Sequence, residues 1–325
     1  MSSKSVPIVL SMLTTAFAVA QPIESLPTEG LPEILRLAVS KSNSLRYNGT
    51  RIVQIKSGGK PQTITEYITR DGERLRIDFP KDSAFAGQII IEDARLRRHF
   101  FPEQNELLTL PPRRGDSLAR LVVGLNRFRN RRKVKVEAGS VVAGRMTREV
   151  VVSDDQGNDL QRLYIDPTTG AVLKSEVYDF AGTPMGSYEF KTIEFVNRVN
   201  PRLFDFRRKG VRIVSPEDQA RELAKKLDLP VVLLPKNSGY QLESARIIQP
   251  EGSDVLVYLY SSPLGRLSVF QTRKEVDERK IRRMDRGELS VKTWRVGPVH
   301  YAVIGPKGNE TNQVASRIER QSRSN

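Results

Sequence analysis

The sequence predicts an α+β protein of two domains, in which most strands are antiparallel. Residues 47–110 read as short alternating runs separated by turn residues, a pattern typical of antiparallel hairpins. Residues 31–45 carry apolar side chains at helical spacing. At residues 215–218, after a rise in charge density, the start of a further helix marks the boundary between a larger and a smaller domain.

The N-terminus has the layout of a secretory signal peptide. Lys4 precedes an uncharged run over residues 6–19, and small residues stand at Ala18 and Ala20. We expect residues 1–20 to be removed and the mature chain to begin at Gln21. The run is shorter than the roughly 20 apolar residues that a spanning helix needs, and no later stretch approaches that length. The mature protein is therefore expected to be exported, without a membrane span.

Composition narrows the possible partners. The chain of 325 residues has no cysteine, which excludes disulfides, thiolate metal sites and a lipid-modified cysteine. Its 53 Lys and Arg against 38 Asp and Glu give a net charge of +15. In a cytoplasmic protein this excess would suggest nucleic acid. Export removes that partner and leaves anionic lipid head groups, lipopolysaccharide phosphates or an acidic protein segment.

Local signals place the elements of the larger domain. Pro32 near the first position and Glu33 in the first turn favour a helix over residues 31–45. A hairpin is expected over residues 66–79, where Asp71-Gly72 is expected to supply the positive φ angles of a tight turn. Asp116 is the expected N-cap of a short helix over residues 117–125. Strands are then expected within residues 133–152 and 160–195.

The smaller domain begins with a helix whose cap is Ser215, with Pro216 at the first position. Its apolar face carries Ala220, Leu223, Ala224 and Leu227, and Pro230 ends it. Strands are expected at residues 254–260, 264–272 and 296–305, and a final helix near residues 312–320.

Little in the sequence suggests catalysis. His99 and His300 fall in strand-like runs without an identifiable partner, and Asp154-Asp155 sit in a polar stretch typical of a solvated turn. No nucleophile elbow, zinc-binding helix or glycine-rich phosphate loop is present. We therefore expect no catalytic residues, no metal and no cofactor, although a site made of carboxylates alone stays open.

A basic stretch is the sharper signal for binding. It holds six cations in nine positions with no acid among them: Arg127, Arg129, Arg131, Arg132, Lys133 and Lys135. Like charges repel one another, so an anionic head group or an acidic partner segment would relieve that repulsion. The alternative is an ordinary solvated loop and strand face.

Two groups of residues resemble a known family. Residues 163–174, LYIDPTTGAVLK, resemble the hairpin of LolA/LolB-like carriers and of the N-terminal domain of RseB/MucB proteins. In the smaller domain, three segments resemble the C-terminal domain of the RseB/MucB family: LPKNSGYQL at 234–242, VLVYLYS at 255–261 and LSVFQ at 267–271. The chain departs from the family pattern at Tyr164, where Trp is commoner, and at Ser262-Pro263, where Asp-Gly is usual.

The resemblance implies a LolA-like antiparallel half-barrel wrapped on helices at residues 21–208, and a smaller α/β domain at 209–325. It also implies a periplasmic regulator that binds the periplasmic domain of a membrane anti-sigma factor. Lipids, lipopolysaccharide or the acyl chains of mislocalised lipoproteins would then be the releasing signal. The alternative is a periplasmic lipid or lipoprotein carrier of the LolA type; a simple carrier of that type lacks the second domain.

The apolar face of the expected half-barrel is the candidate lipid groove. Along residues 74–79 the alternation is clean, with apolar side chains on one face and charged ones on the other. The candidate groove is represented by Leu75, Ile77, Phe79, Val134, Val136 and Ile165. Alternation reports which face is buried and not what covers it, so a closed core remains the alternative.

Overall fold

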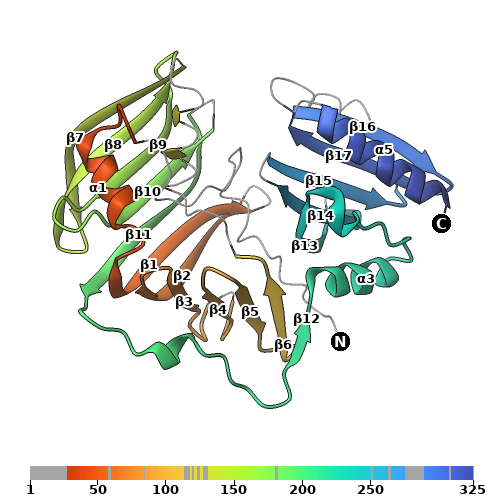
Figure 1. Cartoon of the computed structure of the whole chain (residues 1–325), viewed down its shortest axis with the longest axis horizontal. Coiled ribbons are helices and arrows are strands. Elements are labelled where there is room, and N and C mark those ends of the chain that lie inside the picture. The colour runs from red at the N-terminus through yellow and green to blue at the C-terminus, as the bar shows by residue number, and fades with distance from the viewer. Residues whose placement is uncertain are drawn as a thin grey trace.

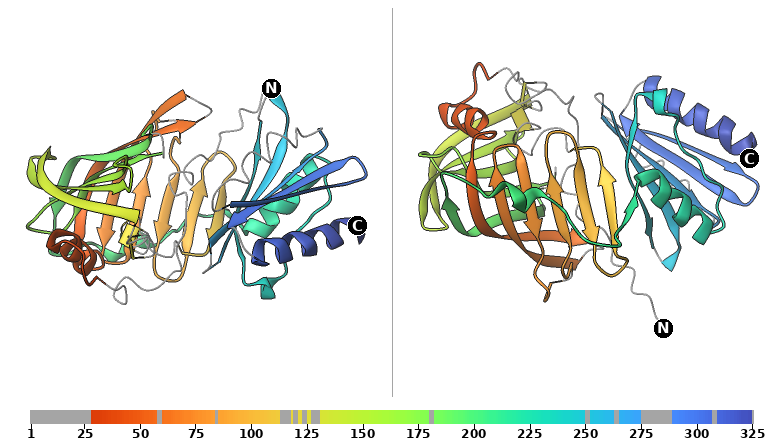
Figure 2. Two further views of the ribbon diagram at one scale, coloured as in Figure 1. Left: turned by 90° about the horizontal axis from the view of Figure 1, so that it is seen from above. Right: turned by 60° about the horizontal axis from the view of Figure 1, so that its bottom comes forward.

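A computed structural model describes residues 28–57, 60–83, 85–112, 118, 121–122, 125–126, 131–179, 182–249, 252–262, 265–274, 289–306 and 309–324. The expected signal peptide, at residues 1–20, lies outside this part of the chain. The described residues form two sheets with three α-helices, so the predicted α+β class is confirmed. The two sheets lie side by side as separate units (Figures 1 and 2).

The larger sheet has twelve strands in the order β12-β6-β5-β4-β3-β2-β1-β11-β10-β9-β8-β7. Every pair is antiparallel except β12 with β6. No pairing joins its two ends within the described residues, so the sheet is open. The strands are β1 (Arg46–Ser57), β2 (Lys60–Asp71), β3 (Arg74–Asp78), β4 (Ile89–Glu92), β5 (Arg97–Phe101), β6 (Glu106–Leu110), β7 (Arg132–Val142), β8 (Arg145–Asp154), β9 (Asp159–Ile165), β10 (Val172–Tyr178), β11 (Pro184–Phe195) and β12 (Arg212–Val214).

Helix α1 (Glu33–Lys41) covers the β7–β10 end of this sheet (Figure 1). It is shorter than the predicted span because Pro32 is its N-cap and the chain turns at Ser42. Its buried face packs together with the described part of the second expected helix. There, Leu118, Val122 and Leu125 are buried, while Ser117 lies outside the described residues. These two helical segments close one end of the apolar face.

The predicted hairpin between β2 and β3 is confirmed, but its turn differs in detail. Asp71 pairs with Arg74 in register, so the two turn residues are Gly72 and Glu73. Only Gly72 of this pair has a positive φ, of 63°. Asp71 therefore belongs to the strand, and its carboxylate instead accepts hydrogen bonds from Arg46 and Arg74.

The turn of the LYIDPTTGAVLK hairpin, between β9 and β10, is held by the buried Asp166. Its carboxylate accepts hydrogen bonds from the Thr168 N–H, the Thr169 hydroxyl and Arg145. Gly170 has a φ of 74°, and a Cβ there would lie 3.0 Å from the Leu37 carbonyl oxygen of α1. The motif therefore fixes the turn and allows α1 to approach it closely.

We expect Gly170→Ala to lower the free energy of unfolding by about 1–3 kcal/mol, because a non-glycine residue is strained at this φ and its Cβ presses on α1. Gly144→Ala is the matched control, since its φ is 75° and a Cβ added there would meet no atom within 4 Å. Denaturant unfolding of both variants separates the two causes. Equal losses would show that the contact with α1 contributes nothing.

The smaller sheet has five strands in the order β13-β14-β15-β17-β16, all antiparallel. They are β13 (Gln241–Ile248), β14 (Val255–Ser262), β15 (Gly265–Thr272), β16 (Leu289–Val296) and β17 (Val299–Pro306). Helices α3 (Pro216–Lys226) and α5 (Asn309–Ser324) pack into one core with them. The predicted Ser215 cap is confirmed, and Asp218 completes a capping box. The smaller sheet and its two helices thus have a core of their own.

Among the described residues, no helix is long and apolar enough to cross a membrane.

Candidate binding site

The candidate site is the face of the larger sheet against which α1 packs, which we call the inner face. Partners in register share a face, and one row runs through Ile68, Ile77, Ile90, His99 and Leu108 on five neighbouring strands. All five side chains are buried. Over β4–β6 the opposite face is also covered, by Val199, Phe204 and Phe206 of the segment after β11. The sheet is thus packed on both faces at this end.

The structure divides the six candidate groove residues between two clusters. Ile77 and Phe79 are buried in a cluster over β1–β4 and β9–β11, and Leu75 packs against it half-buried. Ile165 is fully buried in a second cluster that includes α1, and Val134 and Val136 pack half-buried against that one. The six residues share the inner face of one sheet without forming a single lining.

Surface hollows of ≈ 320 Å³ and ≈ 390 Å³ lie on the larger sheet, and none of the six residues lines either of them. The larger hollow lies over Asn48, Tyr67, Thr69 and their neighbours on β1, β2 and β11. The other is lined by Arg46, Asp71, Arg74, Asn197, Arg198, Val199 and Pro201.

An ion pair that the sequence patterns did not predict lies on the inner face. Arg51 of β1 and Glu66 of β2 are partners in register. Arg51 Nε and Nη2 both donate to Glu66 Oε2, at 2.8 and 2.5 Å. The side chain of Glu66 is 2% exposed and that of Arg51 is 22% exposed. The signal was present in the alternation of β2, where Glu66 occupies an inward position between Ile64 and Ile68.

Aromatic rings complete the surroundings of Arg51. Its guanidinium carbon lies 4.7 Å from the centre of the Tyr188 ring and 6.0 Å from that of Phe190. Burial disfavours the charge of Arg51, but the Glu66 carboxylate outweighs it, and the pKa of the guanidinium is raised. The guanidinium therefore stays charged within an otherwise apolar surface and depends on Glu66 as its partner.

The basic stretch is only partly described, and its residues on β7 lie on both sides of that strand. Arg127 and Arg129 lie outside the described residues. Arg132 lies on the same side of β7 as the half-buried Val134 and Val136, whereas Lys133 and Lys135 are exposed on the opposite side. Lys135 pairs with Glu137, whose hydrogen bond raises the pKa of the ammonium. Arg131 and Lys133 are exposed and have no partner among the described residues.

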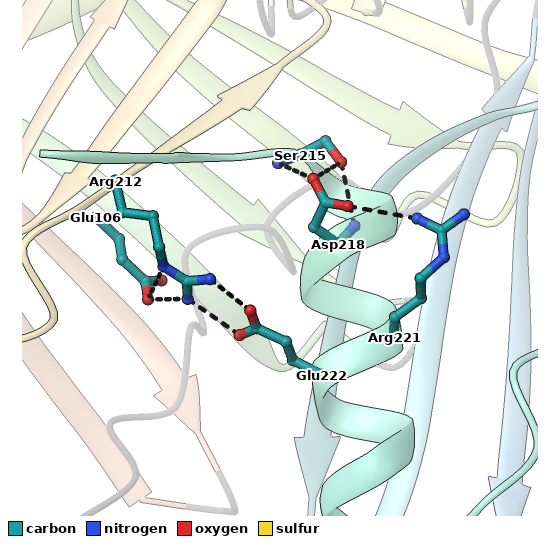
Figure 3. A network of polar contacts seen from close by, with 6 residues as sticks. All are labelled: Glu106, Arg212, Ser215, Asp218, Arg221 and Glu222. Carbon is teal, nitrogen blue, oxygen red and sulfur yellow. Dashed lines mark hydrogen bonds and ion pairs between the residues drawn. The ribbon is translucent and has the colours of Figure 1, made fainter.

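A second network that the sequence patterns did not predict joins the larger sheet to helix α3 (Figure 3). Arg212 of β12 donates to Glu106 of β6 and, at 2.5 Å, to Glu222 of α3. Strand β12 pairs with the edge of the larger sheet and leads directly to Ser215, the cap of α3. The arginine thus connects an edge strand of the first sheet to the first helix of the second, in a position that only the fold reveals.

Two of the residues considered for catalysis, His99 and Asp154, form hydrogen bonds with side chains or backbone of the larger domain. His99 is buried, and its Nε2 lies 2.8 Å from Gln88 Oε1. Asp154 accepts hydrogen bonds from the side chain and backbone of Asn158 and from the Gln156 N–H, which lowers the pKa of its carboxyl. This is the predicted turn. Within the described residues, no three His, Cys, Asp or Glu side chains gather in a way that could hold a metal ion.

Comparisons with known proteins give similarity at the level of solved structures. No family model matches the chain, and no curated protein matches it. A complex of Pseudomonas aeruginosa MucA and MucB is similar at 16% identity and a TM-score of 0.43, over 87% of this chain and 96% of that one. A structure of MucB alone gives 16% identity and a TM-score of 0.45, over 86% and 94%. A LolA superfamily protein from Nitrosomonas europaea gives 10% identity and a TM-score of 0.28, over 53% and 96%.

Proposed function

We propose that this chain is a periplasmic binding protein that holds the outer domain of a membrane anti-sigma factor and releases it in response to envelope lipids or mislocalised lipoproteins. The observation that carries the proposal is the second sheet. This sheet has its own core. Strand β12 and Arg212 connect its helix α3 to the large open sheet, which is of the kind expected for a carrier. A simple carrier has no use for this second unit, whereas a protein that binds a partner does.

The lipid part of the proposal rests on the inner face of the larger sheet. Leu75, Val134 and Val136 are half-buried there, at the margins of the two apolar clusters. Burial yields at most about 0.8 kcal/mol per methylene, so a chain of about twelve carbons offers roughly 10 kcal/mol before ordering costs of several kcal/mol. This free energy is enough for micromolar affinity, provided that the helices packed on the inner face move apart from it to admit the chain.

The partner part of the proposal assigns the basic residues before and on β7 to an acidic segment. Arg131 and Lys133 supply exposed charge that no described residue neutralises. Each cation near an anionic surface contributes about 1 kcal/mol, and salt screens it within roughly 10 Å. Binding through these residues should therefore weaken as salt rises.

The test is a pull-down from envelope extracts with the mature protein at low and high salt. We expect recovery of a membrane protein with one span, and about thirtyfold weaker binding of it at low salt for the double variant Arg131→Ser/Lys133→Ser, since each lost cation costs about 1 kcal/mol. Lys225→Ser/Lys226→Ser, on the exposed side of α3, is the matched control because it removes the same charge. Both double variants should differ little from the parent at high salt.

Recovery of lipoproteins alone would contradict the regulator and favour the carrier of the LolA type. Equal recovery with the two double variants would instead remove only the basic residues from the proposal, since the partner could then be held elsewhere.

A further inference from the structure

The smaller hollow lies on the outer face of the larger sheet, where three arginines meet. Arg46 begins β1 and Arg74 begins β3. Their chain neighbours Tyr47 and Leu75 belong to the inner cluster, so the two arginines point to the other face. Arg198 reaches the same hollow from the segment after β11. The hollow therefore gathers positive charge from three separate parts of the chain.

Two of these arginines are held in place by Asp71. Arg46 Nε donates to Asp71 Oδ1 at 2.7 Å, and Arg74 Nη2 donates to Oδ2. The guanidinium of Arg74 also lies 4.9 Å from the centre of the Phe204 ring. Burial acts to raise the pKa of Asp71, but the two arginines outweigh it and the pKa is lowered. The carboxylate thus remains ionised and fixes the two guanidinium groups.

One carboxylate does not neutralise three guanidinium groups. Arg198 is exposed and has no partner among the described residues. Each guanidinium carries five N–H donors, and Asp71 takes only one from each of its two partners. The hollow therefore keeps an excess of two positive charges and several unused N–H donors. The like charges repel one another, and a bound anion would relieve that repulsion.

We propose that this arginine hollow, formed by Arg46, Arg74 and Arg198, is a binding site for a phosphate-type oxyanion. Arginine forks suit the oxygens of phosphate, which accept paired hydrogen bonds from them. The hollow, of ≈ 320 Å³, is open to solvent, so an anion can reach the guanidinium groups that line it. The site stands apart from the apolar inner face and from the basic residues of β7, and it does not depend on the function proposed above.

Two sources could supply this chemistry, a soluble phosphate or the phosphate of a lipid head group, and the test uses one arm for each. Inorganic phosphate is titrated into the mature protein by calorimetry at low salt. In parallel, the protein is mixed with phosphatidylcholine vesicles that contain or lack phosphatidic acid. We expect phosphate binding that Arg198→Ser weakens by about 10- to 100-fold, the loss expected for a hydrogen bond to a charged group.

Arg198→Ser suits the test because the side chain has no described partner, so its loss should leave the melting temperature unchanged. Arg221→Ser, exposed on α3, is the control with the same charge change. Phosphate binding weakened by the first variant and not by the second supports the site. Vesicle binding with the same dependence then assigns the head group, and its absence assigns a soluble phosphate. No phosphate binding by the parent, or equal weakening by both variants, overturns the proposal.

Discussion

Replacing Glu66 with alanine is expected to lower the free energy of unfolding by about 3–5 kcal/mol, because it leaves Arg51 charged on the apolar inner face without its partner. The exposed pair of Lys191 and Glu189 is the control. Since an exposed pair contributes about 0–1 kcal/mol, Glu189→Ala should have little effect. Unfolding should be followed by circular dichroism, because the one tryptophan, Trp294, lies in the smaller sheet.

The double variant Arg51→Leu/Glu66→Leu distinguishes a lost ion pair from a lost packing contact. Replacing both ions with apolar side chains of similar volume is often neutral or stabilising. We therefore expect the double variant to be more stable than Glu66→Ala. A double variant that is less stable than Glu66→Ala would show that the two side chains stabilise the fold through packing. The loss in Glu66→Ala would then not come from an unpaired charge.

Replacing Ile165 with alanine is expected to cost about 2–5 kcal/mol, the range for shortening a large aliphatic side chain inside a packed core. Ile165 is 0% exposed and packs together with α1 and the strands β7–β9. Met146→Ala is the control, because its side chain is 66% exposed on the neighbouring strand β8. Its effect should stay within about 0.5 kcal/mol.

The acyl-chain proposal is tested in a separate measurement, in which the parent protein and the same variant are mixed with lipid. Native mass spectrometry of the parent and of Ile165→Ala, with single-chain and multi-chain lipids, shows whether the inner face takes up a chain. A parent protein that purifies empty and takes up none of them has a closed core there. The lipid-sensing part of the proposed function would then be wrong, while the partner-binding part would remain open.

Much of the local structure could be predicted from the sequence. The hairpin of β2 and β3 follows from a glycine between alternating runs, and the start of α3 follows from Ser215 and Pro216. Both signals act between residues close in the chain, so neighbouring letters carry them. Strand β16 was not among the predicted strands because its apolar residues do not alternate strictly: Lys292 and Thr293 both stand between Val291 and Trp294.

The candidate sites, in contrast, depend on contacts between residues far apart in the sequence. The α+β class, the inward alternation of β3 and the charge of the basic stretch could all be predicted from the order of residues. Three contacts could be found only in the folded chain: Arg51 with Glu66, Arg212 between β6 and α3, and Arg198 beside Arg46 and Arg74. It also separated the candidate groove residues into two clusters. Alternation assigns a side chain to a face, whereas its partner there depends on strand order and register, and those are set by contacts between segments far apart in the chain.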